Sequence, residues 1–251
     1  MLRLSAGLFA GILIAFFAAP ASAQVPIVMA ASWDGPDNDL QSILDDVYGP
    51  GLIDVDEDYI GAKAGDRDPC VWDAVGIEGF VVAEKAGFGS KNVLGWYEDT
   101  GSPPPFDTGA RVLLPGSAGP GDTFSLFVGS LKTIGFYMNP NGGGGAPNAP
   151  EPECFYSNRF FNDEGRDGSQ RFHAPFDGDP QCLAFDVSAF TQPDTYVLCF
   201  EDHDYGGLTF GGSLQETDND FNDLVIQFTI LHPTPVRETS FGAVKAQLRG
   251  Q

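Results

Sequence analysis

The chain has 251 residues and a net charge of −22 at neutral pH, from 13 basic and 35 acidic residues. Phosphate backbones and anionic lipids repel such a surface, which excludes nucleic acid as a partner and favours cations. Because 42% of the residues are hydrophobic and 21 are phenylalanine, the chain has the composition of a folded protein, and the charge does not indicate disorder.

Residues 1–23 have the features of a secretory signal peptide. Arg3 supplies positive charge, residues 7–17 are apolar, and residues 21–23 form a small-residue cleavage site. This apolar stretch is too short to span a membrane comfortably, and no other stretch approaches the roughly 18 apolar residues that a span requires. We therefore expect a secreted protein in the extracellular space, at the cell surface or in the periplasm, with no membrane span after cleavage.

The first predicted element of the mature chain is a short helix within residues 39–49. Asp39 is a suitable N-cap, and Gly49 can end the helix. The apolar face of this helix comprises Leu40, Ile43, Leu44 and Val47.

The remaining elements are strands, because apolar residues alternate and no further long helical pattern occurs. The predicted strands are 79–84, 93–98, 122–128, 133–138, 182–187, 195–200 and 224–231. Residues 102–109 and 139–153 are rich in proline and glycine, and we expect both to be loops. The prediction is an all-β, antiparallel β-sandwich, jelly-roll-like, formed as a single domain by residues 24–231 with a C-terminal tail at 232–251. Two domains joined through 139–153 are the alternative.

Four cysteines lie in the mature chain, at positions 70, 154, 182 and 199. An even number in an exported protein indicates two disulfides. Three connectivities are possible, and we favour a pairing of Cys154 with Cys182. The alternative is that some of these residues are buried thiols.

The most distinctive motif lies between the last two predicted strands, 195–200 and 224–231. If these strands pair as a hairpin, their acidic ends meet at one end of the sheet. The candidate metal ligands are Glu201, Asp202, Asp218, Asp220, Asn222 and Asp223.

Four clustered carboxylates at this end of the sheet would repel one another by several kcal/mol in total, since each close pair costs about 4 kcal/mol at a protein surface. No lysine or arginine lies between residues 172 and 236. Carboxylate and amide oxygens are ligands of Ca²⁺, whereas Zn²⁺ would find only His203 as a nitrogen ligand in this segment. The motif is not an EF-hand, because Asp223 takes the place of the invariant glycine. We therefore predict a calcium site; the alternative is a solvated acidic hairpin.

The same two segments resemble domain of unknown function 4114, which occurs in exported bacterial proteins. Its signature is a strand ending in F-E-D, a glycine-rich loop, and D-x-D-[FY]-N-D before a hydrophobic strand. The matching positions are Phe200, Glu201, Asp202, Gly206, Gly207, Asp218, Asp220, Phe221, Asn222 and Asp223. The resemblance covers most of residues 75–231; it implies a β-sandwich and a calcium site, and it implies no enzymatic activity.

Three functional classes remain open at this point. The favoured one is an exported calcium-binding module with a non-catalytic binding or structural role, whose partner is an extracellular glycan or protein. The second is a carbohydrate-binding module, with Trp33, Trp72, Trp96 and Tyr97 as stacking residues unless they pack in the core. The third, least favoured, is a glycoside hydrolase; no nucleophile, zinc-protease or phosphate-loop motif is present. A second cation could bind residues 162–168, around Asn162, Asp163, Glu164 and Asp167.

Overall fold

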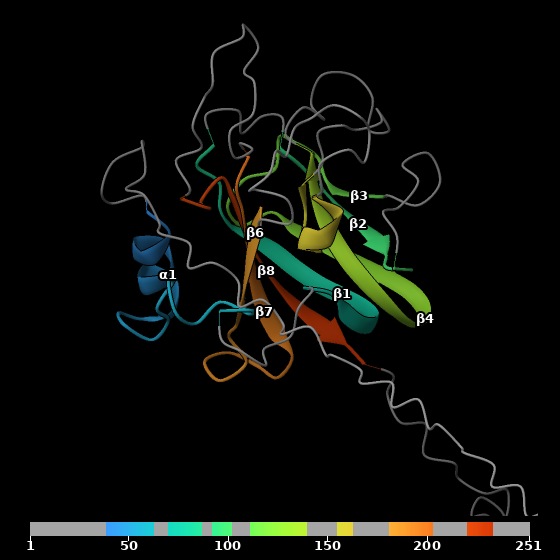
Figure 1. The fold of residues 1–251 in the computed structure, drawn as a ribbon, viewed down its shortest axis with the longest axis horizontal. Coiled ribbons are helices and arrows are strands. Elements are labelled where there is room, and N and C mark those ends of the chain that lie inside the picture. The colour runs from blue at the N-terminus through green and yellow to red at the C-terminus, as the bar shows by residue number, and fades with distance from the viewer. Residues whose placement is uncertain are drawn as a thin grey trace, which may run out of the picture.

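A computed structural model of the protein describes residues 39–62, 70–86, 92–101, 111–139, 155–162, 181–202 and 220–232. Within these ranges the chain forms one α-helix, one short 3-10 helix and the strands of one sheet (Figure 1). The helices are α1 (Leu40–Tyr48) and η3 (Arg159–Phe161). The strands are β1 (Trp72–Ala83), β2 (Val93–Glu98), β3 (Arg111–Leu114), β4 (Thr123–Asn139), β5 (Phe155–Tyr156), β6 (Cys182–Asp186), β7 (Thr195–Phe200) and β8 (Leu224–Leu231). The described helices are too short and polar to cross a membrane.

The strands are ordered β3-β2-β4-β1-β8-β7-β6, and β5 pairs with β4. Every pairing is antiparallel. The sheet therefore combines strands from both sides of the 139–153 segment. The predicted all-β, sandwich-like fold is confirmed.

One main core joins the two ends of this sheet. Leu94 of β2 and Ala184 of β6 belong to the same cluster of buried side chains, although four strands separate β2 from β6. The sheet must therefore curl, so that its two halves face each other across the core. Trp72 lies at the centre of this cluster, with ring centroids 5.1 Å from Phe228 and 5.8 Å from Phe136.

A second core lies on the other face of β6, β7 and β8, beneath α1 (Figure 1). The Asp39 side chain accepts a 2.7 Å hydrogen bond from the backbone nitrogen of Ser42 and so caps the helix. Leu40, Ile43 and Leu44 are buried as predicted. Val47 is 46% exposed, so its assignment to the apolar face was wrong. In the last helical turn it is Tyr48 that packs on this second core, and its hydroxyl reaches Gln227 on β8.

A third, aromatic cluster covers the outer side of β2, β4 and β5 and contains Tyr97, Tyr137, Tyr156 and Phe161. The register between β2 and β4 pairs Tyr137 of β4 with Gly95 of β2, and Tyr97 of β2 with Gly135 of β4. A Cβ atom added at Gly95 would lie 2.1 Å from the Tyr137 ring. Each tyrosine ring therefore occupies the space above a glycine of the opposite strand.

Strand boundaries differ from the predicted ones mainly in β1 and β4. The predicted strand 79–84 was too short, because β1 begins at Trp72. The predicted strands 122–128 and 133–138 are one strand, Thr123–Asn139, and the residues between them form an irregularity within it. Gly129 has a φ of 78°, which glycine adopts without steric cost. The short strands β3 and β5 were not predicted, since residues 111–114 and 155–156 carry too few residues for a periodic signal.

The predicted disulfides are not found among the described cysteines. Cys70, Cys182 and Cys199 are buried thiols, which contradicts the favoured pairing of Cys154 with Cys182; Cys154 itself lies outside the described residues. Cys182 and Cys199 cannot pair with each other, because Cys182 belongs to the main core and Cys199 to the core under α1, on opposite faces of the sheet. Burial raises the pKa of both thiols well above the usual range, which keeps them protonated.

Candidate metal centre

The predicted metal ligands lie at the end of the sheet where β7 finishes and β8 begins. Phe200, the last residue of β7, pairs with Leu224, the first residue of β8. Glu201 and Asp202 directly follow Phe200, and residues 220–223 directly precede Leu224. The antiparallel hairpin pairing expected from the sequence therefore brings both acidic segments together.

Three carboxylates form the centre of this cluster. One carboxylate oxygen from each of Glu201, Asp202 and Asp223 lies within 4.8 Å of the other two. All three side chains are buried, with at most 7% of their surface exposed. The backbone nitrogen of Asp202 donates a 2.6 Å hydrogen bond to Oδ2 of Asp223, which fixes the distance between the two chain segments.

Asp220 and Asn222 extend the cluster along the segment before β8. Both are buried, and Nδ2 of Asn222 donates a 2.8 Å hydrogen bond to Oδ2 of Asp220. Phe221 between them has a φ of 51° and inserts a fully buried ring into the core under α1. A left-handed backbone is costly for a phenylalanine. The buried ring holds this conformation, with Asp220 close to the carboxyl of Asp223 and Asn222 bonded to Asp220.

Removal of the clustered carboxylates from water makes their charged form less favourable. Burial raises the pKa of Asp223 well above its usual range, and the neighbouring charges of Glu201, Asp202 and Asp220 raise it further. Such a group is stabilised either by a proton or by a cation. A divalent cation would stabilise several of these carboxylates at once.

Asn92 joins this site from a part of the chain that sequence reasoning did not connect with it. It is 4% exposed and directly precedes β2, and its Nδ2 donates a 3.3 Å hydrogen bond to Oδ2 of Asp202. Its Oδ1 is buried and has no hydrogen-bond partner within the described part of the chain. Gln181, fully buried, lies next to the site, since its backbone carbonyl accepts a 3.2 Å hydrogen bond from the nitrogen of Glu201. Neither residue stands in a motif, so the sequence carried no signal for them.

Five of the six predicted ligands are thus buried at one end of the sheet, and Asp218 lies outside the described residues. Residues 162–168 were only a candidate for a second cation, with a solvated turn as the favoured interpretation. The side chain of Asn162 accepts a 2.9 Å hydrogen bond from the nitrogen of Tyr156 and donates one of 3.1 Å to its carbonyl. Asn162 therefore holds β5 in place, while Asp163, Glu164 and Asp167 lie outside the described residues.

The aromatic residues considered for sugar stacking are mostly core residues. Trp72 and Tyr97 are fully buried, and Trp96 packs partly buried against the main core. Trp33 lies outside the described residues. The carbohydrate-binding alternative therefore loses Trp72 and Tyr97 as stacking platforms, and Trp96 is only partly accessible.

Comparison with known proteins adds no relative: no family model, no curated protein and no solved structure matches this chain.

Proposed function

We propose that the acidic end of the sheet binds Ca²⁺ and that the protein is an exported, calcium-stabilised β-sandwich module with a non-catalytic binding or structural role. The observation that carries this proposal is the buried triad of Glu201, Asp202 and Asp223, whose carboxylate oxygens lie within 4.8 Å of one another. Asp220 adds a fourth carboxylate next to them. Several buried anions around one point favour a bound cation.

The chemistry of the side chains favours calcium over other metals. The described side chains of the site offer only oxygen ligands, from carboxylates and the amides of Asn92 and Asn222. Ca²⁺ takes six to eight such oxygens in irregular geometry, whereas Mg²⁺ requires a near-ideal octahedron and Zn²⁺ prefers nitrogen and sulfur. An exported protein would meet millimolar calcium, which suits the weak affinity of about 0.1–1 mM typical of extracellular modules.

The burial of the carboxylates favours a structural ion over a catalytic one. A hydrolytic carboxylate must contact its substrate, and here none of the four exceeds 7% exposure. An ion at this position would instead connect the end of β7 to the start of β8, and through Asn92 to the start of β2. The resemblance to domain of unknown function 4114 supports the same role.

Thermal unfolding in chelator and in millimolar Ca²⁺ tests this function. A ligand of the native state alone adds about 2.7 kcal/mol at a hundred times its Kd, which corresponds to roughly 5–10 °C for a domain of this size. Asp223→Asn removes a central charge and keeps the side-chain shape, so it should abolish most of the shift. Asp56→Asn, in an exposed turn, is the matched control and should retain it. If NaCl at equal ionic strength stabilises the protein as much as Ca²⁺ does, the acidic end of the sheet is a solvated hairpin and the proposal fails.

A further inference from the structure

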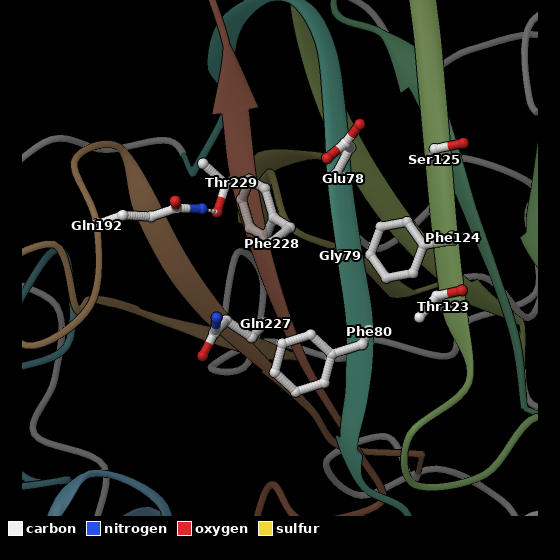
Figure 2. A pocket seen from close by; sticks show the side chains of 10 residues that line it. All are labelled: Glu78, Gly79, Phe80, Thr123, Phe124, Ser125, Gln192, Gln227, Phe228 and Thr229. Carbon is white, nitrogen blue, oxygen red and sulfur yellow. Dashed lines mark hydrogen bonds between the residues drawn. The ribbon is translucent and has the colours of Figure 1, made fainter.

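A groove of about 460 Å³ crosses the outer face of the sheet, away from the acidic centre (Figure 2). It runs over β4, β1 and β8 and reaches the loop between β6 and β7, which contributes Gln192. Its volume lies in the range of small-molecule sites. Thr229, which lines the groove, lies five residues along β8 from Leu224, the residue next to the acidic cluster. At a strand rise of about 3.4 Å per residue, this separation is about 17 Å. We call this groove the outer-face groove.

Strand register places two rows of outward side chains in this groove. In the first row Phe80 pairs with Thr123 on one side and with Gln227 on the other. In the second row Glu78 pairs with Ser125 and with Thr229. Because side chains alternate along a strand, both rows lie on the same face. The two rows thus combine the ring of Phe80 with hydroxyls, an amide and the carboxylate of Glu78.

Three of the polar side chains that line the groove are held in place by hydrogen bonds within the protein. Tyr48 at the end of α1 donates a 2.7 Å hydrogen bond to Oε1 of Gln227, which leaves the Gln227 amide nitrogen as the donor available to a ligand. Nε2 of Gln192 donates to Oγ1 of Thr229 at 2.8 Å, and this hydroxyl also bonds to that of Thr195 at 2.9 Å. In Figure 2, Gln192 and Thr229 are joined by this bond at the edge of the groove. Groups held in this way lose little entropy when they bind a ligand.

The aromatic surface continues beyond the groove along β4. Phe127 follows Ser125 on the same face and is 78% exposed, the most exposed large hydrophobic side chain among the described residues. From Thr123 to Phe127 the face extends about 14 Å along the strand. Its neighbour on β1 is Gly76, which has no side chain to fill the space beside the ring. This surface suits an extended ligand.

From this lining we propose that the outer-face groove binds a neutral, extended polysaccharide. The amides, hydroxyls and carboxylate match the hydroxyl groups of a sugar, and Phe80 offers a ring face to the apolar side of a pyranose. Among the described residues, Glu78 is the only charged side chain that lines the groove. The protein also carries a net charge of −22, so an anionic glycan would be repelled. The site does not depend on the metal centre.

Binding of defined oligosaccharides tests the proposal. The probes are hexasaccharides of β-1,4-linked glucose, xylose and mannose, with polygalacturonate as the anionic comparison, titrated into the full mature chain by calorimetry. At least one neutral probe should bind, and polygalacturonate should not. Phe80→Ala should weaken the binding at least tenfold. Because Phe80 is half-buried, Ser125→Arg provides a second variant at an exposed position that blocks the groove without changing the core.

Matched controls identify the surface that binds. Ser130→Arg introduces the same side chain into the same strand at an exposed position outside the groove. Phe190→Ala removes an exposed ring from the loop that carries Gln192, at a position that does not line the groove. Both variants should bind within twofold of the wild type. The proposal is overturned if no neutral probe binds at millimolar concentration. It is equally overturned if Ser125→Arg binds as Ser130→Arg does, or if a concentration-dependent dimer that Ser125→Arg dissociates shows the groove to be an interface between two copies of the chain.

Discussion

The ring of Tyr137 on β4 lies directly over Gly95 of β2, and the ring of Tyr97 on β2 lies over Gly135 of β4. The two glycines are therefore required by space and not by backbone conformation, since neither has a positive φ. This reciprocal packing holds β2 and β4 in one register: a shift of one residue would drive each ring into a side chain.

Gly95→Ala should destabilise the protein by more than about 2 kcal/mol, because a Cβ atom there would lie 2.1 Å from the Tyr137 ring, and overpacking typically costs 1–3 kcal/mol or more. Gly119→Ala is the control, since its Cβ atom would meet nothing within 4 Å, and it should change stability by less than about 0.5 kcal/mol. Urea denaturation of both variants measures the difference. Equal midpoints would show that the ring moves aside at no cost.

The raised pKa of Asp223 predicts how the calcium-free protein responds to pH. Burial, and then the charges of Glu201, Asp202 and Asp220, favour the protonated carboxyl in the folded state. Its stabilising contribution is therefore fully present below the unfolded value of about 3.9 and is lost as the pH rises through the higher folded value.

In chelator, the free energy of unfolding should consequently fall as the pH rises from about 4 toward neutrality, and Ca²⁺ should restore it. Asp223→Asn should show a smaller fall, because the variant has no proton to lose at this position, whereas Asp56→Asn should follow the wild type. Denaturant titrations across this pH range provide the measurement. A wild type and an Asp223→Asn variant with parallel curves would show that Asp223 ionises normally in the fold.

Asn92 provides a test of the uncharged part of the proposed calcium site. Asn92→Ala should weaken Ca²⁺ binding about tenfold, by analogy with the loss caused by removing groups that orient metal ligands. Asn92→Asp keeps an oxygen and adds a charge, so the calcium-free protein should become less stable while the gain on adding Ca²⁺ becomes larger. Calcium titration monitored by melting temperature gives both quantities. If Asn92→Ala binds as the wild type does, this residue serves packing alone.

Tyr48→Phe should cost about 0.5–1.5 kcal/mol, the net contribution of one hydrogen bond, because Oε1 of Gln227 loses its donor. The phenol remains protonated at every physiological pH, since burial and the nearby Cys199 thiol raise its pKa above the usual range. The variant should also weaken binding of the neutral oligosaccharide to the outer-face groove, because the Gln227 amide could then turn. Gln192→Ala, at the far side of the groove, should weaken that binding without a comparable loss of stability. A Tyr48→Phe variant with unchanged stability and affinity would mean that Gln227 is held by its strand alone.

The sequence predicted those elements whose pattern is local. The helix at 40–48 and the strands at 93–98, 195–200 and 224–231 agree with the structure almost to the residue, because each combines a clear period with a capping residue or a turn signal. The juxtaposition of the acidic residues could be predicted for the same reason: these residues directly follow one strand and directly precede the next. Asn92 was missed because its approach to Asp202 joins residues 110 positions apart. In the sheet β4, β1 and β8 separate β2 from β7, so only the curl of the sheet brings the start of β2 close to the end of β7.

The cysteines show where compositional reasoning failed. An even count in an exported chain indicated disulfides, but the strand pattern decides which way each side chain points. Cys182 and Cys199 each continue an apolar alternation and so point into a core. The residue of β6 that pairs with Cys199 is Leu183, and Cys182 is one position before it. Because successive side chains of a strand point to opposite faces, this one-residue offset places the two sulfur atoms on opposite faces of the sheet.

That offset gives the protein two natural reporters of its own unfolding. The Cys182 thiol becomes reactive only when the two halves of the curled sheet separate, whereas the Cys199 thiol becomes reactive when α1 leaves the opposite face. Alkylation rates of the two residues, followed by mass spectrometry in the native protein, would therefore report separately how often each layer opens. If α1 detaches as an independent unit, Cys199 will be modified far faster than Cys182; if the domain opens all at once, the two rates will coincide.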